Sequence, residues 1–310
     1  IKVNELTKNF GDRRAVDGLI FEARKGEVLG FLGPNGAGKT TTMRMLTGYM
    51  PPTSGTATIA GFDIVEESLE VRKRVGYLPE TVPLYTDMTL HDYLEFFADL
   101  RHLPKVEEAI SETLEMVGLT DRANGYIGNL SKGMRQRIGL AQALMHKPDV
   151  LILDEPTIGL DPAQIIEVRN LIRNIGKERT VLLSTHILSE AQQLCDRIMI
   201  INKGKIVVED TPENLQSRLT GAERVQLRIR GEADSLAEKI RKINGIQDVQ
   251  QIQGEDLLEF QFAPGKDLRP EVARLVIDLN YDLLEMRPIN LSLEDIFLEL
   301  TRNEETTVVE

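Results

Sequence analysis

The 310-residue sequence contains one cysteine, no tryptophan and only 5% aromatic residues. A single cysteine excludes a disulfide within the chain and favours a reducing compartment. No apolar run approaches the roughly 18 residues that a membrane-spanning helix needs, and the first residues show no signal-peptide pattern. We therefore expect a cytoplasmic protein that acts at a membrane only by docking on a protein that spans it.

Basic residues are also scarce. The 37 lysines and arginines face 49 aspartates and glutamates, which gives a net charge of −12. Such an average field repels polyanions, so a nucleic-acid-coating role is disfavoured and no nucleic-acid partner is expected. The excess is uneven, with a net charge of −4 through Thr211 and −8 from Pro212 onward. This asymmetry indicates a domain boundary, and the chain length suits two domains.

Short apolar runs alternate with helical patterns through residues 1–211, which is typical of an α/β sheet. Strands are expected at residues 1–7, 14–24, 27–32, 55–60, 74–78, 150–153, 180–184, 197–201 and 205–208. The first two indicate an antiparallel β layer. Residues 81–147 read instead as a mostly helical insertion, in which Thr89 and Asp92 form an N-capping pair.

A second domain is predicted at residues 212–302, followed by a flexible tail at 303–310. Its pattern indicates a β-α-β-α-β order, with elements at residues 225–230, 235–243, 257–262, 267–279 and 283–287. These elements predict a small α+β accessory domain. Self-association, effector binding and passive support of a dimer are its three candidate roles.

A glycine-rich turn follows the apolar run at residues 27–32. It reads Gly33-Pro34-Asn35-Gly36-Ala37-Gly38-Lys39-Thr40, and a helical pattern over residues 39–47 follows it. The glycines let backbone N–H groups converge on phosphate oxygens, Lys39 supplies charge to the β and γ phosphates, and the Thr40 hydroxyl can bind Mg²⁺. The start of the helix adds partial positive charge. The spacing predicts a P-loop NTPase core, against the alternative of a chance glycine-rich turn.

A second element supports nucleotide chemistry. The apolar run Val150-Leu151-Ile152-Leu153 ends in Asp154 and Glu155. Two acids after a strand usually begin a solvated loop. Beside a phosphate loop, however, Asp154 can hold the Mg²⁺ shell and Glu155 can polarise a water for attack on the γ-phosphate.

These motifs, with four others in the same order, resemble the ATP-binding subunit of an ABC transporter over roughly the first 210 residues. The family's signature resembles Leu130-Ser131-Lys132-Gly133-Met134-Arg135-Gln136-Arg137, and its histidine switch resembles Ser184-Thr185-His186. The loop that crosses the dimer interface resembles Ile158-Gly159-Leu160-Asp161. The segment that couples nucleotide to the membrane subunit resembles Tyr77-Leu78-Pro79-Glu80.

The resemblance implies a P-loop core with an antiparallel β subdomain and a helical signature subdomain, working as a homodimer that closes around two ATP molecules. Phe10 and Val16 would contact adenine, Thr41 would belong to the phosphate site, and His186 would sense the γ-phosphate. Ser131 and Gly133 would complete the partner's site, close to Asp161. Independently of the resemblance, Ser131 can N-cap the helix over residues 134–145, whose positive end is an anion site.

Two departures from the family pattern stand out. Glu80 replaces the usual glutamine, while Lys132 and Met134 replace a glycine and a glutamine of the signature. Glu80 would place a third carboxylate near Mg²⁺, where it can ligate metal or accept from water. The Tyr-Leu-Pro-Glu segment and the ending at residues 290–301 resemble exporters with separately encoded six-helix membrane subunits, including multidrug and gliding-motility-associated systems. The ending is also typical of an ordinary capped amphipathic helix.

Two functions follow as hypotheses. The first is an ATPase that drives an exporter from the inner face of the cell membrane, through an integral membrane permease. The second is a soluble ABC-type ATPase acting on nucleic acid or the ribosome. Such relatives carry two ATP domains or a long coiled-coil insertion, and this sequence shows neither. His91, His102, His146 and Cys195 lack metal-ligand spacing and are expected to be packing or surface residues.

Overall fold

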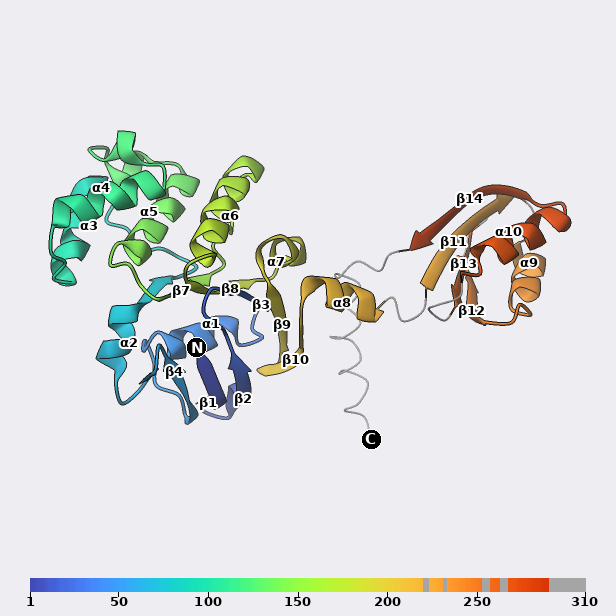
Figure 1. The fold of residues 1–310 in the computed structure, drawn as a ribbon, viewed down its shortest axis with the longest axis horizontal. Helices are drawn as coiled ribbons and strands as arrows, with labels where there is room; N and C mark the ends of the chain where they lie inside the picture. The colour runs from blue at the N-terminus through green and yellow to red at the C-terminus, as the bar shows by residue number, and fades with distance from the viewer. Residues whose placement is uncertain (220–222, 231–232, 253–256, 263–266, 290–310) are drawn as a thin grey trace. The chain divides into compact units, whose positions relative to one another are not determined.

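The computed structural model describes residues 1–219, 223–230, 233–252, 257–262 and 267–289 (Figure 1). The chain divides into two compact units, Ile1–Pro212 and Glu213–Glu310. The helix expected over residues 290–301 and the tail at 303–310 lie outside the described residues. Within the described residues, no helix is both long and apolar enough to cross a membrane.

A six-stranded sheet forms the centre of the first unit, in the order β10-β9-β3-β8-β7-β6. Its strands are β3 (Val28–Leu32), β6 (Val75–Leu78), β7 (Val150–Asp154), β8 (Thr180–Thr185), β9 (Arg197–Asn202) and β10 (Lys205–Asp210). β10 is antiparallel to β9, and the other neighbours pair in parallel. Every residue of β3, β7 and β8 is buried, as the apolar runs predict for a parallel sheet covered on both faces.

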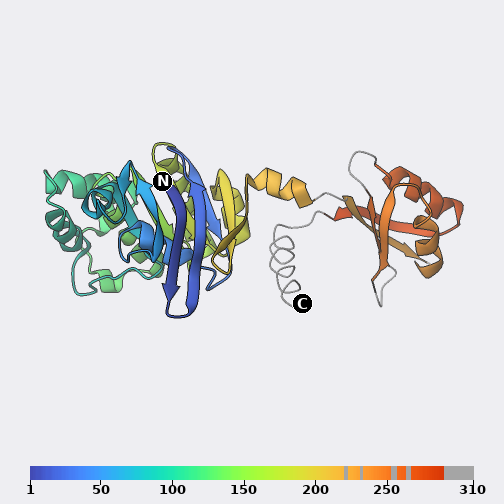
Figure 2. The same ribbon diagram turned by 90° about the horizontal axis from the view of Figure 1, so that it is seen from below.

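A second, antiparallel sheet has the order β2-β1-β4-β5. It consists of β1 (Lys2–Phe10), β2 (Arg13–Glu22), β4 (Ser54–Ile59) and β5 (Phe62–Asp63), and Figure 2 shows the long strands β1 and β2 side by side. One hydrophobic cluster joins this sheet to the central sheet through α1 (Lys39–Leu46), whose Met43 and Leu46 are fully buried. The helix that follows the glycine-rich turn is thereby held between the two sheets.

Three helices form the expected helical part of the first unit, gathered at one end of the central sheet in Figure 1. They are α3 (Leu90–Leu100), α4 (Val106–Met116) and α5 (Lys132–Leu144). The Thr89 hydroxyl accepts from the Asp92 N–H at 3.1 Å, which confirms this N-cap. Ser131 caps α5 by accepting from the Met134 N–H at 3.3 Å, and α5 begins two residues earlier than expected.

Three helices of the structure were not predicted. They are α2 (Ser68–Arg74), α6 (Pro162–Gly176) and α8 (Pro212–Leu219). The signal for α6 was present, because Asp161 is its N-cap and Pro162 occupies its first turn. α7 (Leu188–Leu194) follows β8 and covers the helix-like pattern that the sequence shows over Ser189–Leu194.

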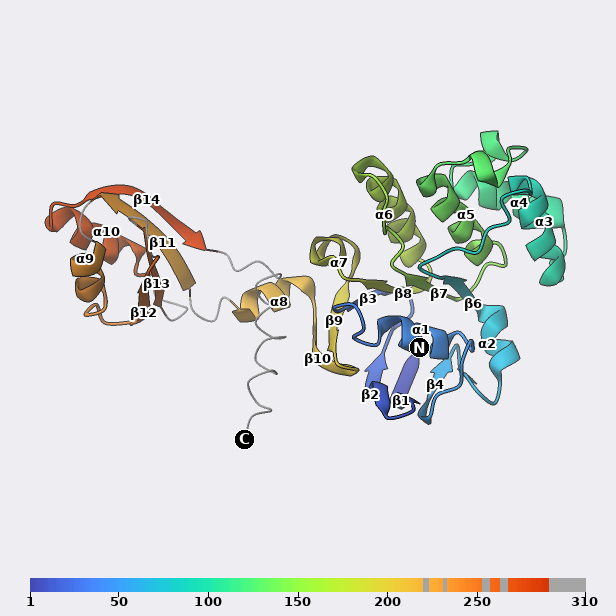
Figure 3. The ribbon, with the colours of Figure 1, turned by 180° about the vertical axis from the view of Figure 1, so that it is seen from behind.

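The second unit contains a four-stranded antiparallel sheet in the order β12-β13-β11-β14. Its elements are β11 (Glu223–Arg230), α9 (Ala233–Ile240), β12 (Ile246–Gln251), β13 (Leu257–Phe262), α10 (Arg269–Asp278) and β14 (Asp282–Ile289). α9 and α10 pack on one face of the sheet (Figure 3). The expected β-α-β-α-β order was wrong, since β12 intervenes. Only Val249 of this polar edge strand is fully buried, so it lacks the apolar alternation that identifies a strand.

Candidate functional site

A cavity of about 590 Å³ opens where the loops after β3, β7 and β8 meet the turn between β1 and β2. Of the residues singled out in the sequence, it is lined by Phe10, Pro34, Asn35, Gly36, Gly38, Lys39, Thr40, Thr41, Glu80, Glu155 and His186. The parallel strands bring these together because their carboxyl ends lie at one edge of the sheet. The fold therefore assembles one site from five separate stretches of sequence.

The glycine-rich turn owes its shape to residues without a side chain. Gly36 and Gly38 have φ values of 80° and 110°, which favour glycine. A Cβ on Gly38 would lie 2.6 Å from the Ala15 carbonyl oxygen. The turn therefore packs closely against β2. Its residues line the cavity just before the start of α1.

Lys39 is 6% exposed and points its ammonium back into this turn. Its Nζ donates to the Gly33 carbonyl oxygen at 2.6 Å and lies 3.4 Å from Glu155 Oε1. A buried ammonium in this position concentrates positive charge where a phosphate group would bind.

Asp154, the last residue of β7, and Glu155, the residue after it, lie in different environments. Asp154 is fully buried, and its Oδ1 accepts from the Ser184 hydroxyl at 2.5 Å. Its Oδ2 is also buried and, within the described residues, has no hydrogen-bond partner. An unpaired carboxylate oxygen costs free energy unless a cation or water satisfies it, and carboxylate and hydroxyl oxygens are preferred Mg²⁺ ligands. The Oδ2 atom of Asp154 therefore fits a magnesium ligand, and Thr40 and Glu80 offer oxygens from the cavity lining, which among the described residues does not include Asp154.

Glu155 faces the cavity from a strained backbone position, with φ at 50°. Its Oε2 lies 2.9 Å from His186 Nδ1, while its other oxygen faces Lys39. The carboxylate is thus held by two basic side chains from different strand ends. A carboxylate in this setting can accept a proton from a water in the cavity.

Of the two residues expected to contact adenine, Phe10 lines the cavity and Val16 does not. Phe10 is 50% exposed, and Lys8 Nζ lies 5.5 Å from its ring centroid. Val16 is fully buried beneath the glycine-rich turn, where its Cγ2 would be 3.4 Å from a Cβ on Gly38. The structure brings Ala15 and Arg13, rather than Val16, to the cavity wall.

Five further predicted residues lie outside the cavity lining, within the described residues: Gly33, Ala37, Ser131, Gly133 and Asp161. Gly33 and Ala37 support the turn, because a Cβ on Gly33 would lie 2.5 Å from the Ile201 carbonyl oxygen and 3.2 Å from the Ala37 Cβ. A Cβ on Gly133 would meet Gln164 Oε1 at 2.2 Å, so the signature packs against α6. Asp161 accepts from the Gln164 N–H at 3.0 Å.

Among the described residues, a neighbouring cavity of about 300 Å³ is lined by two of the three residues that depart from the family pattern, Glu80 and Lys132, but not by Met134. Glu80, Lys132, Arg135 and Ile158 line it. Glu80 and Ile158 also line the larger cavity, so they form the wall between the two. Glu80 therefore lines one small cavity with two basic residues of α5, Lys132 and Arg135. Within the described residues, however, no ion pair joins them, and Arg135 donates to the Gly128 carbonyl oxygen at 2.7 Å.

Sequence reasoning missed a buried network beside the site. Glu190 of α7 is 2% exposed, accepts from the Thr157 hydroxyl at 2.6 Å and from the Thr185 hydroxyl at 3.2 Å, and pairs with Arg169 at 3.6 Å. It links the loop that carries Glu155 to the loop that carries His186. The signal was weak, since one glutamate in a helical run is usually exposed.

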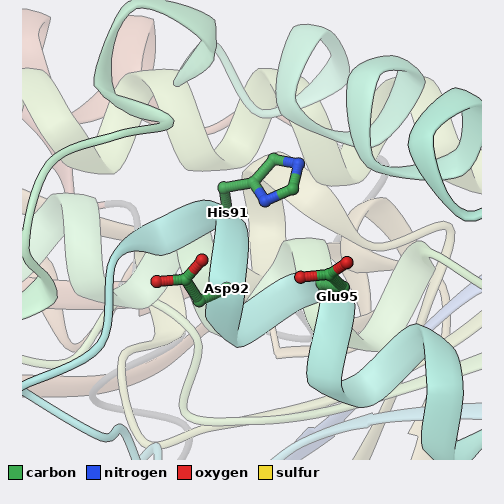
Figure 4. Close-up of side chains that lie close together, drawn as sticks. All are labelled: His91, Asp92 and Glu95. Carbon is green, nitrogen blue, oxygen red and sulfur yellow. The ribbon is translucent and has the colours of Figure 1, made fainter.

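The remaining candidate residues show packing or surface roles. His91, Asp92 and Glu95 place ligand-type atoms within 4.8 Å of one another at the start of α3 (Figure 4). The two acids are exposed and suit a helix N-terminus, and His91 Nε2 lies 3.1 Å from Glu107. We therefore interpret these three residues as charged surface groups at the start of α3 rather than as a metal site. Burial raises the pKa of the Cys195 thiol, as expected for a packing residue.

Comparison with known proteins gives a consistent result. The sequence model described as "ABC transporter" matches residues 16–158. An uncharacterized ABC transporter ATP-binding protein of Bacillus subtilis is 40% identical over 97% of this chain and 95% of its own length. The bacitracin transport ATP-binding protein of Bacillus licheniformis is 37% identical over 97% and 96%. A solved ATP-binding subunit of an ABC transporter matches with a TM-score of 0.64 at 29% identity, covering 71% of this chain and 92% of that chain.

Proposed function

Because the chain belongs to the ATP-binding proteins of ABC transporters and is an ATPase, we propose that it powers an exporter. In this proposal two copies dimerise around two ATP molecules and drive a separate membrane-spanning subunit. The observation that carries the proposal is the meeting of Lys39, Glu155 and His186 in one cavity with the glycine-rich turn. Relatives named for bacitracin transport, linearmycin resistance and Nod factor export support the export direction.

The chain's own residues would divide the work as follows. The glycine-rich turn, Lys39 and Thr41 bind the phosphates, and Phe10 stacks on the base. Thr40, Asp154 and Glu80 would hold Mg²⁺, which when bound neutralises phosphate charge. Glu155 accepts the proton of the attacking water. His186 holds the Glu155 carboxylate and lies where it can sense the γ-phosphate.

The partner copy would supply the missing side of the site. Ser131 and Gly133 lie at the start of α5, where the Ser131 hydroxyl and the helix N-terminus favour anions. Ser131 is exposed and lies outside the lining of its own chain's cavity, so its hydroxyl can face a γ-phosphate bound by the second copy, whereas Gly133 is buried against Gln164 and would contribute through the N-terminus of α5. Hydrolysis would then reopen the dimer, and this movement would be passed to the membrane subunit.

A groove beside the helical subdomain suits the membrane partner. It encloses about 880 Å³ between the end of α1, α2 and the end of α3. Tyr49, Leu69 and Leu100 in its wall are 74%, 67% and 62% exposed, and Arg72, Lys73 and Arg101 flank them. This combination fits a short amphipathic segment with acidic ends from the permease. The protein would thereby sit peripherally on the inner face of the membrane.

The proposal is tested by replacing the base. In Glu155→Gln, ATP binding is expected to persist while turnover is abolished, because the amide cannot accept the proton. Steady-state ATPase activity and equilibrium ATP binding measure the two properties. Hydrolysis at the parental rate by this variant would show that the base is elsewhere.

Purification of the protein from detergent-solubilised membranes distinguishes the exporter hypothesis from the hypothesis of a soluble ATPase. An exporter subunit is expected to co-purify with an integral membrane protein. Recovery only in the soluble fraction, together with ribosomes or nucleic acid, would contradict the exporter proposal and favour the second hypothesis.

A further inference from the structure

Ser184, near the end of β8, lies between the two acids that end β7. Its hydroxyl donates to Asp154 Oδ1 at 2.5 Å and accepts from the Glu155 N–H at 3.0 Å. All three residues are buried. A hydroxyl has a single proton, so donation to Asp154 turns its lone pairs toward Glu155. One oxygen atom thus orients both acids.

In this arrangement the two carboxylate oxygens of Asp154 differ in their hydrogen bonding. Oδ1 is occupied by the serine hydroxyl, and the buried Oδ2 has no hydrogen-bond partner among the described residues. The serine therefore determines which oxygen stays available to a cation. Partners of metal-binding carboxylates tune metal affinity in this way.

The same hydroxyl supports the unusual backbone of Glu155. A φ of 50° is rarely adopted by a residue with a side chain. The Glu155 N–H points at both the carbonyl oxygen and the hydroxyl of Ser184, at 3.2 and 3.0 Å. This contact helps to hold the Glu155 carboxylate where it meets Lys39 and His186.

We propose that Ser184 is a positioning residue of the ATPase site, which presents Asp154 to Mg²⁺ and Glu155 to the attacking water. The inference rests on the roles proposed above for these two acids. Ser184 is fully buried, and it acts through its neighbours rather than by touching the nucleotide.

The test measures metal binding apart from hydrolysis. Mn²⁺ is titrated into the full chain saturated with a non-hydrolysable ATP analogue, and free Mn²⁺ is followed by electron paramagnetic resonance. Ser184→Ala is expected to weaken Mn²⁺ binding about 10-fold or more, the usual effect of removing a partner of a metal ligand. The rate constant for hydrolysis is expected to fall as well. Ser184→Thr, which keeps the hydroxyl, should stay close to the parent in both.

Thr180→Val is the matched control, because it removes another buried hydroxyl from the same strand. Thr180 Oγ1 donates to the Arg24 carbonyl oxygen at the opposite end of β8, so Mn²⁺ affinity should not change. Parental Mn²⁺ affinity in a folded Ser184→Ala variant would overturn the inference. If that variant does not fold, Ser184→Cys, whose thiol is a weak donor, is expected to show the same weakening, and parental affinity there would overturn the inference equally.

Failure of the proposed function would look different. It would appear as parental hydrolysis by Glu155→Gln, whatever the behaviour of Ser184. If Glu155→Gln is inactive while Ser184→Ala binds Mn²⁺ like the parent, only the role of Ser184 is contradicted.

Discussion

At the scale of single residues, the site combines features that would be costly elsewhere. Glu155 adopts a left-handed backbone, and Asp154 buries an oxygen that has no partner among the described residues. Such features cost on the order of 1–3 kcal/mol each. Their concentration beside Lys39 indicates a site organised for a phosphate and a cation rather than for stability alone. The sequence motifs predicted these residues, but not Ser184 or Glu190, because single polar residues in a strand or helix carry no distinctive spacing.

His146 provides a pH test of the fold. Burial and the nearby Arg101 lower the pKa of His146 from 6.5 to about 4. Between these values the unfolded chain binds a proton at His146 and the folded chain does not. The contribution of neutral His146 to the free energy of unfolding is therefore fully present above pH 6.5 and is lost as the pH falls toward 4. We expect the melting temperature of the parent to fall relative to that of His146→Gln across this window. A difference that stays constant from pH 7 to pH 4 would contradict the assignment.

Glu80 and Lys132 give a second test. Because they line one cavity with Arg135, we expect their charges to compensate each other. Glu80→Gln and Lys132→Gly should each reduce ATPase activity severalfold, while the double variant should lose less than the product of the two effects. ATPase rates of the four proteins form the double-mutant cycle. Strictly multiplicative effects would show that the two positions act independently.

At the scale of elements, buried strands were predicted from the sequence more accurately than exposed ones. β3, β7 and β8 are wholly buried and were predicted within a residue or two of their ends. β12 was missed because this edge strand has one buried residue, Val249, and α2 because it is short and also has one, Val71. The meeting of distant stretches in one cavity depends on strand order. Periodicity cannot supply that order, and the family resemblance predicted only which motifs meet at the nucleotide, not the order of the strands.

The groove between α1, α2 and α3 makes a prediction about the partner. Leu69→Asp combined with Leu100→Asp is expected to abolish co-purification with the membrane subunit, because it adds charge to an apolar wall, while basal ATPase activity should persist. Ile20→Asp is the control, since Ile20 in β2 is 60% exposed. Retained co-purification of the double variant, or equal loss in the control, would contradict docking in this groove.

At the scale of the whole molecule, each unit has its own core. Among its described residues, the second unit buries thirteen in one cluster, including Val225, Phe260 and Val276. The described residues that line the proposed nucleotide cavity all precede residue 211. The negative charge is likewise concentrated after Pro212. The acidity of the chain therefore describes mostly the accessory unit, and it does not oppose binding of an anionic nucleotide in the first unit.

Truncation after Thr211 tests this division. The shortened chain is expected to bind ATP with parental affinity, because the site lies in the first unit. A change in dimer stability would favour a supporting role for the second unit, and a changed ATPase rate at equal dimer stability would favour regulation. Loss of ATP binding in a folded truncated chain would contradict the assignment of the site to the first unit.

Closure of two copies around ATP is the event on which the proposed transport function depends. The most direct measurement is the mass of Glu155→Gln by light scattering during gel filtration, with and without ATP and Mg²⁺. We predict a monomer without nucleotide and a dimer with ATP, and we predict that adding Ser131→Arg abolishes the dimer by blocking the signature. A monomer at saturating ATP, with binding verified, would contradict the account.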